Sequence, residues 1–151
     1  GESSWTIPKV RIKGRKGRKR PHRVPLPARA IQLLETLPRD AENPFLFQGQ
    51  KNGKHISDGA LRVLLVRMSI TNATTHGFRS TFRTWAAEQT RFPREMLEKA
   101  LAHVVGDETE QAYDRGDLFE KRRKLMEAWA GYCASKPVAR AGAVIAIGNA
   151  A

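Results

Sequence analysis

The stretch THGFRSTFRTWAAEQ, residues 75–89, decides how the second half of this sequence folds. Its apolar side chains recur at the spacing of one helical face: Phe78, Phe82, Trp85 and Ala86. This spacing predicts an amphipathic helix that packs into a core. Thr75 is the expected N-cap, because its hydroxyl can accept a hydrogen bond from an N–H group of the first turn.

A neighbouring face of the same predicted helix is polar. Arg79 lies one turn after His76 and one turn before Arg83. An imidazole and a guanidinium beside a helix N-terminus, where backbone N–H groups favour an anion, suit a phosphate group. The His-x-x-Arg spacing taken alone is equally typical of a structural or salt-bridged pair.

The composition indicates one globular domain with a polyanionic partner. The chain has 151 residues, of which 40% are hydrophobic, so it can bury a core. Lys and Arg number 27 against 15 Asp and Glu, and the net charge is +12. Such a surplus favours nucleic acid as the partner, with an anionic membrane surface as the second candidate.

Several classes are disfavoured. No apolar run approaches the roughly 18 residues of a spanning helix, and no signal-peptide pattern opens the chain, so we expect a soluble, cytoplasmic protein. The single cysteine, Cys133, excludes an intrachain disulfide. No Cys/His cluster has zinc spacing, and we expect neither a metal nor another cofactor.

A basic hairpin is predicted over residues 5–26. The arms SWTIPKVRIK and PHRVPL flank GRKGRKR, whose two glycines permit the turn. Pro8 and Pro25 mark both arms as edge strands. The basic residues around the tip are either a solvated charge run or contacts to DNA phosphates: Arg15, Lys16, Arg18, Lys19 and Arg20.

Further helices follow from apolar periodicity. We expect helices over residues 26–37, from Ser57 or Asp58 as cap to about residue 68, over 93–103, and over about 118–133. The 93–103 helix is expected to pack on the 75–89 helix through Met96, Leu97, Ala100 and Leu101. The predicted fold is α+β, mainly helical, with a small antiparallel sheet on the N-terminal side.

The last helix has an expected apolar face of Leu118, Leu125, Met126, Trp129 and Cys133. The opposite face should be solvated and basic: Lys121, Arg122, Arg123 and Lys124. Asp117 and Glu120 have the spacing of a capping box at its start.

Two residues around the 93–103 helix have open interpretations. His103 at its end is more typical of a helix cap than of a catalyst. Tyr113, in EQAYDRGD, stands in a polar context that suits approach to a ligand better than burial.

The ordered motifs HGFR, LAH and AYDR, followed by DLFEKRRKLMEAWAGYC, resemble the catalytic domain of tyrosine recombinases of the phage and prophage integrase type. The upstream WTIP…RIK…HRVPL resembles the hairpin that precedes these motifs, so the resemblance spans roughly residues 5–133. It implies a partial catalytic domain over residues 1–137, with the hairpin at about 5–26 and the helical part at about 27–133. Residues 138–151 are either a frayed tail or, as the resemblance implies, a segment that docks in cis or on a neighbouring subunit.

The resemblance also implies roles on double-stranded DNA. Tyr113 would be the nucleophile that becomes joined to a 3′-phosphate, and Arg79 with His103 would stabilise the charged phosphorane. His76 would help to accept or return the proton of the nucleophile. Lys13 would be the general acid for the departing 5′ oxygen. The basic tip looks longer than usual, so Lys16 or Lys19 is an alternative acid. The protein would act as a homo-oligomer on DNA without a metal.

The family places its first catalytic arginine on a helix before the hairpin, and only GESS precedes Trp5 in this sequence. We therefore expect this chain alone to cleave DNA very poorly or not at all. Three rival functions remain. A non-catalytic DNA-binding module would explain the charge, and a type IB topoisomerase would share the tyrosine chemistry. A metal nuclease is disfavoured by the lack of a carboxylate cluster.

Overall fold

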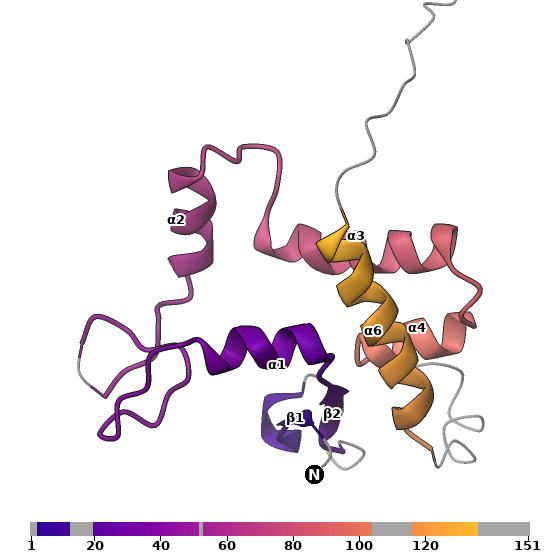
Figure 1. Cartoon of the computed structure of the whole chain (residues 1–151), viewed down its shortest axis with the longest axis horizontal. Helices are drawn as coiled ribbons and strands as arrows, with labels where there is room; N and C mark the ends of the chain where they lie inside the picture. The colour runs from indigo at the N-terminus through magenta and orange to yellow at the C-terminus, as the bar shows by residue number, and fades with distance from the viewer. Residues whose placement is uncertain (1–2, 13–19, 52, 104–115, 136–151) are drawn as a thin grey trace, which may run out of the picture.

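A computed structural model describes residues 3–12, 20–51, 53–103 and 116–135 of the chain (Figure 1). The predicted α+β fold, mainly helical with a small antiparallel sheet near the N-terminus, is confirmed. The helices are α1 (Ala28–Glu35), α2 (Ala60–Arg67), α3 (Thr75–Gln89), α4 (Arg94–Ala100) and α6 (Phe119–Ala134). Each falls where apolar periodicity predicted a helix, within about three residues at either end.

The base of the predicted hairpin forms the sheet. Strands β1 (Ser4–Ile7) and β2 (His22–Pro25) pair antiparallel, with Ile7 opposite His22. The first arm ends earlier than predicted, because Pro8 has no N–H group for the ladder. A 3-10 turn, η1 (Lys9–Arg11), follows and is closed by the Arg11 N–H donating to the Pro8 carbonyl at 2.9 Å.

The predicted caps were wrong at three helices. At α3 the cap is Thr74 and not Thr75, because Thr74 has the extended backbone of a cap and its Oγ1 accepts from the Gly77 N–H at 3.0 Å. At α2 neither Ser57 nor Asp58 caps, since the N-cap position falls on Gly59 and no side chain bonds to it.

The capping box at α6 does not form either. Asp117 Oδ1 accepts from the Phe119 N–H at 3.1 Å. Glu120, which the box required as its other half, pairs instead with Arg123 one turn further along the helix at 3.2 Å. Leu118 occupies the N-cap position with a left-handed backbone.

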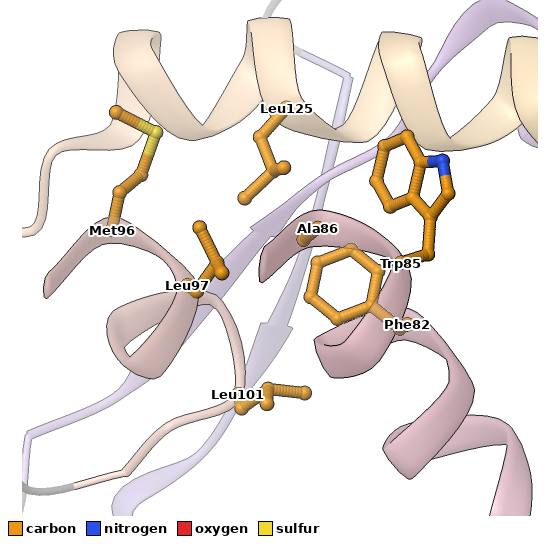
Figure 2. Packing of buried hydrophobic residues seen from close by; sticks show 7 residues of the cluster. All are labelled: Phe82, Trp85, Ala86, Met96, Leu97, Leu101 and Leu125. Carbon is orange, nitrogen blue, oxygen red and sulfur yellow. The ribbon is translucent and has the colours of Figure 1, made fainter. Parts of the chain in front are cut away.

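The core lies where α3, α4 and α6 meet. Figure 2 shows Leu125 of α6 directed toward the buried side chains of α3 and α4. The buried cluster consists of Phe82, Trp85, Ala86, Met96, Leu97, Leu101 and Leu125. The predicted packing of α4 on α3 is therefore confirmed, and Leu118, Ala100, Met126 and Trp129 pack against the cluster as expected.

Three residues lie on the opposite side of the surface from the one predicted: two are exposed instead of buried, and one is buried instead of exposed. Phe78 is 55% exposed, because the first turns of α3 lie outside the cluster. Cys133 is exposed in the last turn of α6, past the residues that reach the core. Arg122, expected in a solvated basic face, is only 1% exposed, because its side chain turns toward β2.

The α2 helix stands apart from the group of α3, α4 and α6 (Figure 1). Several of its apolar side chains are exposed: Leu61, Val63, Leu64 and Val66. A surface hollow of about 470 Å³ separates α2 from residues 48–57. None of the predicted site residues that the structure describes lines this hollow. Arg79 and Arg83 lie instead on α3, and His103 lies just after α4.

Candidate active site

Arg79 of α3 is held at the C-terminal end of α4. Its Nη2 donates a hydrogen bond to the carbonyl oxygen of Leu101, directly after the last residue of α4. The last carbonyls of a helix have no partner within the helix and carry partial negative charge, which favours a cation. The first predicted motif is thereby joined to the second, HGFR to LAH.

His103 is fixed by the way α4 ends. The chain turns at Ala102, whose φ of 54° lies in the left-handed region. The His103 N–H donates to the Glu98 carbonyl at 2.9 Å, and the Ala102 N–H donates to the Lys99 carbonyl at 3.1 Å. This pair of bonds is the Schellman motif, with alanine where glycine is usual. α4 therefore ends at Ala100, and His103, predicted as the last residue of this helix, lies three residues beyond it.

Glu98 lies between the two motifs. Its Oε1 accepts from Arg83 Nε at 3.0 Å, and its Oε2 lies 2.5 Å from His103 Nδ1. The Glu98 side chain is 13% exposed. Its pKa is lowered, first by the hydrogen bond with His103 and then by that with Arg83. Sequence reasoning missed Glu98, because its role depends on the approach of α3 to α4.

Residues 116–118 are tied to three other elements. Lys99 Nζ of α4 donates to the Gly116 carbonyl at 2.9 Å. The Asp117 carboxylate accepts from Arg23 Nε of β2 at 3.1 Å. Arg122 Nε donates to the Asp117 carbonyl at 2.7 Å. The approach to α6, which follows Tyr113 in the sequence, is therefore anchored to α4 and to the hairpin.

His22 of β2 is a second residue that sequence reasoning missed. Its ring is hydrogen-bonded to the Ala100 backbone, next to the Leu101 carbonyl that Arg79 uses. Burial lowers the pKa of His22, and the positive charge of Arg122 lowers it further. The sequence placed His22 in the second hairpin arm, PHRVPL, which predicted a strand but gave no indication of a site.

The remaining predicted site residues divide into two groups. His76 is exposed in the first turn of α3, and Arg20 is exposed just before β2. The others lie outside the described residues, so their predicted roles stay predictions: Lys13, Arg15, Lys16, Arg18, Lys19 and Tyr113. The predicted tail, 138–151, lies outside them as well.

Within residues 3–12, 20–51, 53–103 and 116–135, no three His, Cys, Asp or Glu side chains are grouped so that they could hold a metal ion. Over the same ranges, no helix combines the length and apolar character needed to cross a membrane.

This chain is similar in sequence to several integrases. Prophage integrase IntA of Escherichia coli strain K12 is 34% identical over 131 residues, covering 85% of this chain and 30% of that protein. Prophage integrase IntZ of the same strain is 32% identical over 131 residues, covering 85% of this chain and 31% of that protein. The integrase of Shigella phage Sf6 is 31% identical over 125 residues, covering 80% of this chain and 32% of that protein. No family model and no solved structure matches the chain.

These similarities confirm the resemblance to integrases read from the ordered motifs. Over 80–85% of its length, this chain is similar to phage and prophage integrases. The chain spans about a third of the length of the relatives it matches.

Proposed function

We propose that this chain takes part in site-specific DNA recombination, in which a tyrosine cuts and rejoins a DNA strand through a 3′-phosphotyrosyl intermediate. The observation that carries the proposal is the placement of Arg79 and His103. They come from different motifs, and both are held around the C-terminal end of α4. The similarity to prophage integrase IntA and to the integrase of Shigella phage Sf6 supports the same reading.

In the proposed reaction, the hydroxyl oxygen of Tyr113 attacks the phosphorus of a DNA phosphodiester. A new P–O bond forms, and the bond to the 5′ oxygen breaks. The 5′ oxygen leaves with a proton from Lys13, or from Lys16 or Lys19, and the Tyr113 proton passes to His76. Because the new phosphodiester retains the energy of the broken bond, rejoining requires no metal and no cofactor.

Arg79 and His103 stabilise the charge that develops on the phosphate. A guanidinium has five N–H groups in a planar fork, and the bond to Leu101 uses one of them. The others remain for the non-bridging oxygens. Fixed donors lower the barrier most, since they need no reorganisation as the charge grows.

The basic residues bind the DNA backbone in this proposal. The net charge of +12 supplies attraction, and the hairpin-tip residues Arg15, Lys16, Arg18, Lys19 and Arg20 contact phosphates. Arg83 pairs with Glu98, yet half of its side chain is exposed, so its outer N–H groups can also contact a phosphate. The protein acts as a homo-oligomer on double-stranded DNA in the bacterial cytoplasm.

The test uses the full-length protein and nicked duplex DNA that carries the candidate attachment site. An SDS-resistant protein–DNA adduct is expected from the wild type, in the presence of EDTA, and none from Tyr113→Phe. Salt-sensitive DNA binding without any adduct would contradict the proposal and indicate a non-catalytic DNA-binding module. Relaxation of supercoiled plasmid without strand exchange would indicate a topoisomerase instead.

A further inference from the structure

We propose that Glu98 is a positioning residue that orients the imidazole of His103 toward the DNA phosphate, and that Arg83 holds Glu98 in place. The inference rests on the proposed strand-transfer function and adds to it a residue outside the three motifs. Glu98 lies in α4, between the motif that contains Arg79 and the predicted nucleophile segment.

Both oxygens of the Glu98 carboxylate are used. Arg83 donates to Oε1 through Nε at 3.0 Å and through Nη2 at 2.9 Å. His103 Nδ1 lies 2.5 Å from Oε2. A carboxylate shared by two donors on different elements has a defined orientation, which a single exposed ion pair does not give.

The contact selects one arrangement of the imidazole. An ionised carboxylate only accepts hydrogen bonds, so His103 Nδ1 must carry a proton. The lowered pKa of Glu98 keeps this carboxylate ionised. His103 Nε2, on the opposite side of the ring, is then the nitrogen left to meet the phosphate. Fixing one imidazole nitrogen in this way sets both the tautomer and the direction of the other.

The carboxylate is not needed to hold the backbone of His103. That backbone is already fixed by the bond from the His103 N–H to the Glu98 carbonyl at 2.9 Å, and by the turn at Ala102. What the carboxylate adds is the orientation of the ring. A role in ring orientation predicts a loss of cleavage rate without a loss of DNA affinity.

The experiment measures adduct formation at saturating DNA, DNA affinity and thermal unfolding of the full-length protein. For Glu98→Ala, we expect the cleavage rate to fall by roughly 10-fold or more, because misplaced catalytic groups cost about that much, with DNA affinity within twofold of the wild type. Glu98→Gln keeps one accepting oxygen, so its rate should lie between those of Ala and the wild type. Glu88→Gln on the exposed side of α3 removes the same charge and should match the wild type.

Ring nitrogen NMR adds a measurement that a merely structural role would not change. With ¹⁵N-histidine, and with His103→Asn to assign the signal, the wild type should show the proton of His103 on Nδ1, and Glu98→Ala should lose this preference. Unchanged rate and unchanged tautomer in Glu98→Ala would overturn the inference. If Glu98→Ala does not fold, a wild-type rate in Glu98→Gln overturns it.

The two proposals fail in different ways. If the wild type forms no adduct, the proposed function fails and this inference fails with it. If the wild-type adduct depends on Tyr113 but tolerates the loss of Glu98, only the inference is overturned.

Discussion

Arg122 of α6 donates from Nη1 to the carbonyl oxygen of Arg23 on β2 at 2.7 Å, joining the last helix to the hairpin. The same guanidinium donates from Nε to the Asp117 carbonyl at 2.7 Å and lies 3.5 Å from the Asp117 carboxylate. Arg122 is nevertheless part of the basic run KRRK, in which both lysines are exposed. One buried cation therefore connects elements that lie at opposite ends of the chain.

Replacing Arg122 should destabilise the fold. A lysine cannot reach both carbonyls with a planar fork, so Arg122→Lys leaves a buried acceptor without its donor. We expect the free energy of unfolding to fall by about 1–3 kcal/mol, measured by urea denaturation. Arg123→Lys is the matched control, because Arg123 is more exposed and forms an ion pair with Glu120 one turn earlier in α6. This substitution should change stability by about 0.5 kcal/mol or less. Equal effects of the two substitutions would contradict the structural role of Arg122.

The turn at Ala102 offers a stabilising substitution. Its φ of 54° is unfavourable for a residue with a Cβ and easy for glycine. Ala102→Gly should therefore raise the free energy of unfolding by roughly 1 kcal/mol, seen as a higher urea midpoint. Ala100→Gly, two residues earlier at the last helical residue of α4, should instead lower it by about 0.5–1 kcal/mol, because Ala100 is helical and packs against the core. A loss of stability in Ala102→Gly would show that Ala102 does not adopt this left-handed turn.

His22 should make stability depend on pH. Its pKa is lowered in the folded protein by burial and by Arg122, so in the window below its ordinary value of 6.5 the unfolded chain binds more protons than the folded one. Stability then rises with pH through this window, and the contribution is lost as the pH falls below 6.5.

The measurement compares urea unfolding of the wild type and of His22→Gln at pH 5.5 and pH 7.5. Glutamine can still donate to the Ala100 backbone but does not titrate, so the gain in stability between the two pH values should shrink. A pH dependence that is the same in both proteins would assign it to other groups.

Local pattern predicted the helices, and contacts between distant segments decided the rest. The periodicity of residues 75–89 placed α3 and most of its core face, because that information lies within one helix. It failed at Phe78, because the sequence of α3 does not show how far along this helix the packing against α4 and α6 extends. Neither could the run KRRK reveal that Arg122 faces β2, because β2 lies about a hundred residues earlier in the chain.

The site shows the same division. HGFR and LAH could be found as ordered motifs, and their meeting at the end of α4 follows from the packing that was predicted. Glu98 and His22 could not be found from the sequence, because their contacts are made with residues on other elements of the fold. Whether Tyr113 reaches the same place remains a prediction.

The short helix α4 contacts three residues from separate segments of the sequence. Arg79 bonds to the Leu101 carbonyl directly after this helix, His103 is held by its closing turn, and Gly116 bonds to Lys99 on its side. Any displacement of α4 would carry these three attachments with it and leave their mutual spacing intact. A neighbouring molecule that moves α4 would therefore move Arg79, His103 and Gly116 together.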